Sequence, residues 1–194
     1  MTTHMNQTAS KEIRILSIAL SARGFGYCVV ENRMILECGN KGVKGNKNLQ
    51  AVYKIEKLLK QFLPSHLVLQ DVNAMNCRRA PRIKALHRQI IELAAKQKLI
   101  VSLFSGKQLR DALLDDVKGT KYEMAKMLAK KFPIELANKL PPKRRPWENE
   151  DGRMDMFDAV GLAVALGLKN QREIGSVAGS SVKNNYCSCS GFCA

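Results

Sequence analysis

Residues Ile13 to Val30, IRILSIALSARGFGYCVV, are the strongest indication of the fold that we predict for this chain. Its first part, 13–20, is apolar enough for a strand that is buried on both faces. The next part, 21–26, is expected to form a tight connection in which Gly24 and Gly26 supply positive φ angles. Residues 27–30 are β-branched and aromatic, which favours an antiparallel return strand. The chain therefore opens with a central strand and its antiparallel partner.

Apolar patterns further along the chain alternate between strand and helix periodicity. The predicted strands are 34–39, 66–72 and 100–104, and the predicted helices are 49–62, 83–98, 106–114, 120–132 and 155–168. Ser105 is a plausible N-cap, and Thr120 with Glu123 forms a capping-box pattern. Strand, helix and strand in succession predict parallel crossover units, hence an α/β domain with a mixed sheet. The prolines and basic residues of 141–147 predict an extended loop.

These patterns divide the chain into three parts. Residues 1–12 are polar and are expected to form a flexible N-terminus without an apolar signal core. Residues 13–168 hold the apolar periodicity and are expected to form one domain. Residues 169–194 are expected to form a flexible tail that carries Cys187, Cys189 and Cys193. Their C-x-C-x3-C spacing is a poor match to a zinc site, and reactive thiols are the better interpretation.

Charge is the strongest compositional signal. The chain has 32 Lys and Arg residues against 17 Asp and Glu residues, a formal net charge of +15. A polyanionic partner such as DNA or RNA is the natural inference, and a merely solvated basic surface is the alternative. No run of about 20 apolar residues is present, so we expect no membrane span and a cytoplasmic protein. Cys28, Cys38 and Cys77 are expected to behave as small apolar residues.

Carboxylates occur where predicted strands end and where the last helix begins. Asp71 closes the strand at 66–72, and Asp155 and Asp158 lie one helical turn apart at the start of the last helix. An i, i+3 spacing places two side chains on one helical face, as metal chelation requires. Two-metal nucleases use such converging carboxylates to hold Mg²⁺ ions that activate water. The alternative is that a helix N-terminus favours acidic residues through its dipole.

At these positions the chain resembles the RuvC-type Holliday junction resolvases of the RNase H-like superfamily. The resemblance rests on four stretches, 15–30, 66–72, 119–133 and 140–165, and spans roughly residues 13–168. It implies an RNase H-like (RuvC-type) fold with a mixed five-stranded sheet flanked by helices. It further implies binding of branched or junction DNA, a homodimer, and Mg²⁺ or Mn²⁺ as cofactor if the protein is active. Asp155 and Asp158 match the closing helix of the family and are the implied metal ligands.

Two positions depart from the family pattern. The family has Asp at the end of the first strand, where this chain has Ala19, and Glu in the 66–72 strand, where this chain has Gln70. Asp71 replaces the missing Glu only if a bulge re-aims it, because neighbours on a strand point to opposite faces. Glu150 and Asp151 are lesser candidates. We therefore expect poor metal binding and little cleavage, in a natural pseudo-nuclease or in a deliberately inactivated sequence.

Basic residues form three groups that are expected to meet phosphates near the candidate site. They are Arg78, Arg79, Arg82, Lys84 and Arg88; then Lys107, Arg110, Lys118 and Lys121; then Lys143, Arg144, Arg145 and Arg153. Trp147 is expected to contact the core rather than a base, and His87 to lie on the surface or in helix packing. Two alternatives to an impaired resolvase stay open: a non-catalytic nucleic-acid-binding scaffold, and an RNase H-like nuclease acting on another DNA or RNA substrate.

Overall fold

The computed structural model describes residues 13–74, 78–114 and 119–178, with side chains as far as Lys169. Its centre is a mixed five-stranded sheet with the strand order β3-β2-β1-β4-β5. The strands are β1 (Arg14–Leu20), β2 (Gly24–Glu31), β3 (Met34–Gly42), β4 (His66–Gln70) and β5 (Ile100–Phe104). β1 pairs antiparallel with β2 and parallel with β4, so the N-terminal strand is the centre of the sheet, as predicted.

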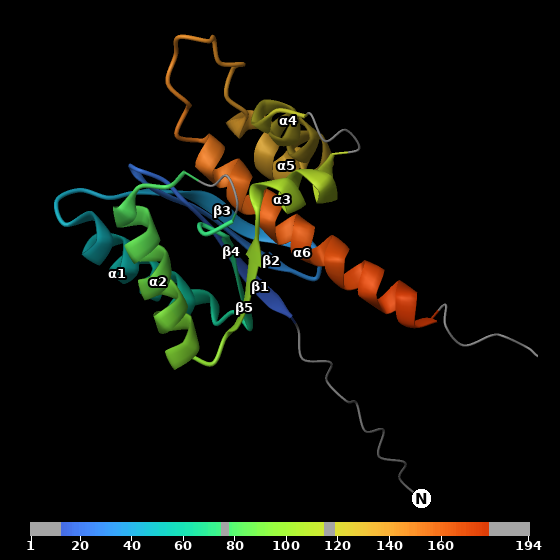
Figure 1. The fold of residues 1–194 in the computed structure, drawn as a ribbon. Coiled ribbons are helices and arrows are strands. Elements are labelled where there is room, and N and C mark those ends of the chain that lie inside the picture. Colours follow the sequence, from blue (N-terminus) through green and yellow to red (C-terminus); the bar gives the residue numbers. More distant parts are fainter. Residues whose placement is uncertain (1–12, 75–77, 115–118, 179–194) are drawn as a thin grey trace, which may run out of the picture.

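Helices cover both faces of the sheet (Figure 1). On one face lie α1 (Lys47–Phe62) and α2 (Pro81–Lys96). On the other lie α3 (Gly106–Leu113), α4 (Lys121–Lys131), α5 (Pro133–Leu136), the 3-10 turn η1 (Ala137–Lys139) and α6 (Met154–Ala178). Within the described part of the chain, no helix is both long enough and apolar enough to cross a membrane.

β1 divides its side chains between two cores, because alternate residues of a strand point to opposite faces. Leu16, Ile18 and Leu20 pack with α1 and α2. Ile15 and Ala19 belong to the core under α6. Ser17 also lies on the α6 face, where its hydroxyl donates to the carbonyl oxygen of Ala159 at 2.7 Å. This buried bond ties α6 directly to the central strand.

The predicted caps are confirmed. The Ser105 hydroxyl accepts from Gln108 N at the start of α3, and the Gln108 side chain accepts from Ser105 N. The same reciprocal arrangement joins Thr120 and Glu123 at the start of α4. These caps satisfy backbone N–H groups that the first helical turn leaves unpaired. The cap on α4 also fixes the position of Lys121, the first residue of that helix.

The predicted glycine turn is wrong. β2 already begins at Gly24, and neither Gly24 nor Gly26 has a positive φ. Both glycines instead allow neighbouring backbone to pack closely against β2. A Cβ on Gly24 would overlap the carbonyl oxygen of Lys41, and a Cβ on Gly26 would overlap the carbonyl oxygen of Asp155. In the turn between β2 and β3, positive φ occurs at Asn32 and Arg33.

Three further expectations need correction. The last helix was predicted to end at residue 168 but continues to Ala178, so the expected domain boundary falls inside it. The strand predicted over 66–72 ends at Gln70. Trp147, expected to contact the core, is 77% exposed on the loop before α6, with the Arg145 guanidinium 5.9 Å from its ring centroid.

Cys28 is buried as predicted, whereas Cys77 and the three C-terminal cysteines lie outside the described residues.

Candidate nucleic-acid site

The two positions that depart from the family pattern lie side by side at the ends of the central strands. Ile18 of β1 pairs with Leu69 of β4, and both point into the core under α1 and α2. The next residues, Ala19 and Gln70, therefore face α6 together at the carboxyl ends of parallel strands. This edge is where α/β sheets place their ligands. The two positions are therefore neighbours at one edge of the sheet.

The beginning of α6 brings its two aspartates, Asp155 and Asp158, close together. Asp158 and Gln70 line one small cavity, together with Lys121 and Gly106. Burial raises the pKa of Asp155, while the nearby Ser21 hydroxyl and the Lys121 ammonium act against this rise. Burial also raises the pKa of Asp158, again against Lys121. Both carboxyls are thus partly withdrawn from water, beside strand ends that supply no further negative charge.

Lys121 reaches from the start of α4 into this cluster. Its Nζ lies 2.9 Å from Asp158 Oδ2 and 3.2 Å from Glu150 Oε1. Desolvation lowers the pKa of Lys121, but the two carboxylates outweigh it, so the pKa is raised overall. A lysine predicted to contact phosphate is instead paired with two of the candidate carboxylates.

Asp71 does not join the cluster. The pairing of β4 with β5 runs without a register shift through Gln70, so the bulge that Asp71 required is absent there. Asp71 Oδ1 accepts from Asn73 N at 2.9 Å, and its carboxylate acts electrostatically on His87 of α2. His87 is buried on the α1–α2 side of the sheet. Asp71 therefore faces away from Gln70, as strand alternation requires.

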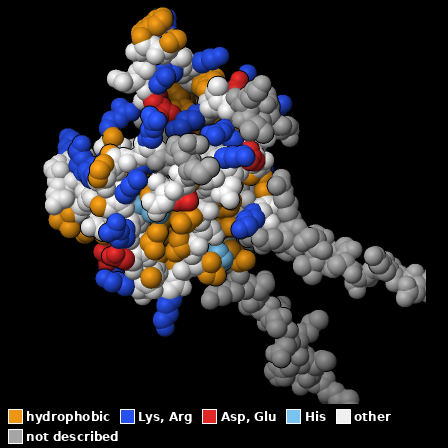
Figure 2. Space-filling view, in the orientation of Figure 1, with side chains coloured by type: hydrophobic (Ala, Val, Ile, Leu, Met, Phe, Trp, Pro, Cys, Tyr) orange, Lys and Arg blue, Asp and Glu red, His pale blue; other side chains and the backbone are white. Residues whose placement is uncertain are grey.

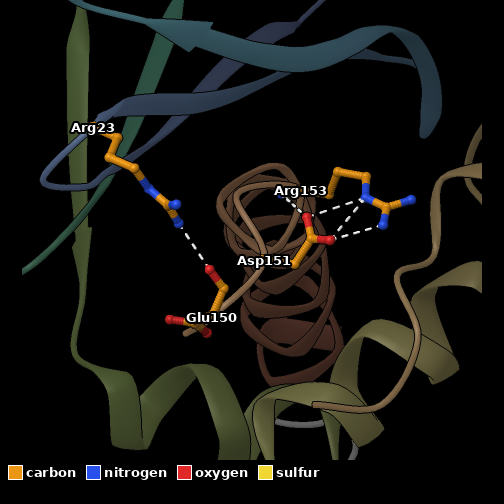
Figure 3. A network of polar contacts seen from close by, with 4 residues as sticks. All are labelled: Arg23, Glu150, Asp151 and Arg153. Carbon is orange, nitrogen blue, oxygen red and sulfur yellow. Dashed lines mark hydrogen bonds and ion pairs between the residues drawn. The ribbon is translucent and has the colours of Figure 1, made fainter. Parts of the chain in front are cut away.

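Glu150 and Asp151 lie in the loop that leads into α6, and arginines hold both (Figure 3). The Arg23 guanidinium donates to the carbonyl oxygen of Glu150 at 2.8 Å. Asp151 binds Arg153 at 2.7 Å and accepts from its backbone N–H, which lowers the pKa of Asp151. Asp151 is therefore occupied by Arg153. Sequence reasoning missed Arg23, which lies in the short turn after the strand that carries Ala19.

Gln70 has a cationic partner of its own. Its Oε1 accepts from Arg79 Nη2 at 2.6 Å. Arg82 acts differently: it donates to Asn48 Oδ1 at 3.0 Å and to the Ala22 carbonyl oxygen at 3.1 Å. Arg82 therefore joins the β1–β2 turn to α1 and α2, and its predicted role at the nucleic-acid surface is at least partly structural.

Most of the predicted basic residues are exposed. Figure 2 shows Lys and Arg side chains gathered over the half of the molecule that holds α4 and the loop before α6. The exposed members are Arg78, Lys84, Arg88, Lys107, Arg110, Lys143, Arg144, Arg145 and Arg153, and Lys118 lies outside the described residues. A cavity of about 440 Å³ opens beside the site, lined by Lys121, Lys143, Arg144 and Glu150 among others. The surface is suited to an anionic polymer.

The residues present do not fit a pair of divalent metal ions. Among the described residues, no group of three or more His, Cys, Asp or Glu side chains is placed to hold a metal. Ala19 has no ligand oxygen, Gln70 is neutral and bound to Arg79, and Lys121 occupies one side of Asp158 and Glu150. Mg²⁺ requires several hard, charged oxygen ligands in near-octahedral geometry.

The fold is shared with solved structures of Holliday junction resolvases. Thermus thermophilus RuvC superposes with a TM-score of 0.59 at 15% identity, over 83% of this chain and 97% of RuvC. T. thermophilus RuvC in complex with a Holliday junction substrate gives 0.63 at 14% identity, over 83% and 96% of the two chains. The yeast mitochondrial Holliday junction resolvase Ydc2 gives 0.57 at 16% identity, over 86% and 84%. No protein-family model and no curated protein matches the sequence.

The molecule is an α/β protein with a mixed five-stranded sheet between two helical layers, which is the RNase H-like class. Within that class its fold is RuvC-like, as the sequence resemblance predicted. Because the identities are 14–16%, the likeness establishes the fold alone.

Proposed function

We propose that this protein binds branched DNA in the manner of a RuvC-type resolvase, and that its metal-dependent cleavage is impaired. The observation that carries the proposal is the pair Ala19 and Gln70, side by side at the sheet edge where the resemblance expects two metal-binding carboxylates. Exposed lysines and arginines are nevertheless numerous on the surface of this chain. Binding and cleavage therefore become separable properties of this chain.

Binding is supported by charge and position. The chain carries a net charge of +15, and exposed arginines and lysines flank the strand ends on α2, α3 and the loop before α6. Contacts from such residues to phosphate supply affinity and are sensitive to salt. A solved RuvC structure holds a Holliday junction substrate, which makes junction DNA the first substrate to test here.

Impaired cleavage follows from the ligand chemistry. In two-metal hydrolysis the ions lower the pKa of the attacking water and neutralise charge on the leaving oxygen. Their affinity depends on the number and charge of the carboxylate oxygens that converge on them. Asp155 and Asp158 lie close to the strand ends, but positions 19 and 70 add no charge to them. In the unmodified chain, Mg²⁺ or Mn²⁺ is therefore expected to support little or no cleavage.

A homodimer is part of the proposal, because a four-way junction presents two equivalent strands to a protein that binds it symmetrically. Light scattering of the full chain, alone and with a four-way junction, tests this point. Two chains per junction is the expected stoichiometry, and one chain per junction would contradict it.

The main experiment compares binding and cutting on a panel of substrates. The full chain is titrated into a four-way junction, a linear duplex of the same sequence and an RNA–DNA hybrid, in EDTA and then with Mg²⁺ or Mn²⁺. We expect preferential junction binding in EDTA and negligible cutting with either metal. Equal affinity for all three would favour a general nucleic-acid-binding scaffold, and cutting of the hybrid would favour an RNase H-like nuclease with another substrate. Robust junction cutting would contradict the impaired site.

A further inference from the structure

Lys121 has an unusual position for a helical lysine. It is the first residue of α4, where the helix dipole disfavours a positive charge. The capping box at Thr120 and Glu123 already satisfies the start of the helix without it. Helix formation therefore gives no reason for a cation here, and the reason has to come from what the side chain contacts.

What it contacts is a pair of carboxylates at the candidate site. Lys121 Nζ lies between Asp158 Oδ2 at 2.9 Å and Glu150 Oε1 at 3.2 Å. The Asp158 side chain is only 13% exposed, whereas that of Lys121 is 49% exposed. A carboxylate withdrawn from water to this degree needs a partner charge, and Lys121 supplies it.

The charge balance at the site agrees with this arrangement. Ala19 and Gln70 remove two negative charges from the strand ends relative to the family pattern. The remaining carboxylates are Glu150, Asp155 and Asp158. Their total negative charge is smaller than that of the family pattern, so less positive charge neutralises it. The ammonium group of Lys121 pairs with two of these carboxylates, and Arg79, bound to Gln70, adds a second cation.

We propose that Lys121 is the resident cation of this site: its ammonium group holds Glu150 and Asp158 together, so that the site keeps its shape without a divalent ion. Lys121 is thus a positioning residue whose charge replaces that of a metal. This inference rests on the proposed function only in the loss of the metal site, and it is tested without DNA. If the protein does not bind junctions, the proposed role of Lys121 is not contradicted. If Lys121 does not have this role, the proposal of DNA binding is not contradicted.

The test measures thermal stability and Mn²⁺ binding of the full chain. The unmodified protein should melt at the same temperature in EDTA and in excess MnCl₂, and should leave the electron paramagnetic resonance signal of free Mn²⁺ unchanged. Lys121→Met leaves Asp158 without a partner charge, so its melting temperature should fall by roughly 5–10 °C in EDTA. Mn²⁺ should then bind to Lys121→Met and restore most of that loss.

Two further variants make the result decisive. Lys126→Met removes an exposed lysine of the same helix and should show neither the fall nor the response to Mn²⁺. The double variant Lys121→Met/Asp158→Asn removes both charges. In EDTA its melting temperature should be higher than that of Lys121→Met, and it should fold even if Lys121→Met does not. Stoichiometric Mn²⁺ binding by the unmodified protein would overturn the proposal. So would a Lys121→Met variant that Mn²⁺ does not stabilise, or a double variant no more stable than the single one.

Discussion

The backbone of Gly26 in β2 lies against the backbone of Asp155 in the first turn of α6, so closely that a Cβ at position 26 would overlap the Asp155 carbonyl oxygen. Gly26 also pairs with Ala19 across the β1–β2 ladder. The absence of one side chain therefore sets the distance between α6 and the strand end. A glycine that resembles a turn residue in the sequence is instead what positions the aspartates of the candidate site.

Gly26→Ala should displace the first turn of α6 and reduce the free energy of unfolding by about 1–3 kcal/mol. Gly42→Ala is the matched control, because a Cβ at Gly42 of β3 meets nothing within 4 Å. Denaturant unfolding of both variants is the measurement. Equal stability of the two would show that α6 can move away from β2 at little cost.

Salt dependence should identify the basic residues that contact phosphate. Arg78, Lys84 and Arg88 are exposed, so replacing all three by Ala should reduce the slope of log K against log salt by about one per lost contact. Arg82 is left in place because it bonds to Asn48 and to the β1–β2 turn. Lys96→Ala, at the opposite end of α2 from Arg78, is the control and should leave the slope unchanged. An unchanged slope in the triple variant would place the DNA elsewhere on the protein.

Ala19→Asp with Gln70→Glu should create a cluster of four carboxylates with Asp155 and Asp158. Position 19 is only 4% exposed, so the new carboxylates should repel one another and lower the melting temperature in EDTA. Mn²⁺ should raise it again and support cutting of a four-way junction. Each single variant should cut less than the pair. A well-folded double variant that neither binds Mn²⁺ nor cuts would contradict the placement of the site.

Stability should fall on mild acidification because of His87. Burial lowers its pKa, although the Asp71 carboxylate and the Gln70 backbone act against this. As the pH falls, the unfolded chain therefore protonates His87 at a higher pH than the folded protein does. The contribution of neutral His87 to the free energy of unfolding is complete above about pH 6.5 and is lost as the pH falls toward the folded pKa. His87→Leu should reduce the slope of melting temperature against pH between about pH 7 and about pH 5. The same slope in both proteins would exclude His87 as its source.

Ending the chain after Lys169 should leave the melting temperature within a few degrees of the full chain. Every α6 side chain described as buried lies at or before Leu166, so the core remains intact. A second chain that ends after Ala178 keeps the whole helix and is the control. A large fall in the shorter chain alone would show that the last turns of α6 contribute to packing.

Local signals in the sequence were enough for most of the fold. Apolar periodicity, the caps at Ser105 and Thr120, and the proline-rich basic loop depend on interactions within a few residues, and the structure has all of them. The absence of acids at Ala19 and Gln70 is a fact of composition that folding cannot change. The sequence alone therefore determined the fold class, the basic surface and the deficit of carboxylates.

Tertiary structure decided which side chains meet at the site. Gln70 and Asp71 are adjacent in sequence, but the pleat of β4 sends only Gln70 toward α6. Lys121 and Asp158 are 37 residues apart, and their ion pair depends on how α4 docks beside α6. Gly26 acts through a helix that begins more than a hundred residues later. Contacts of this kind have no periodic signal, because they arise from packing between separate elements rather than from the local conformation of any one of them.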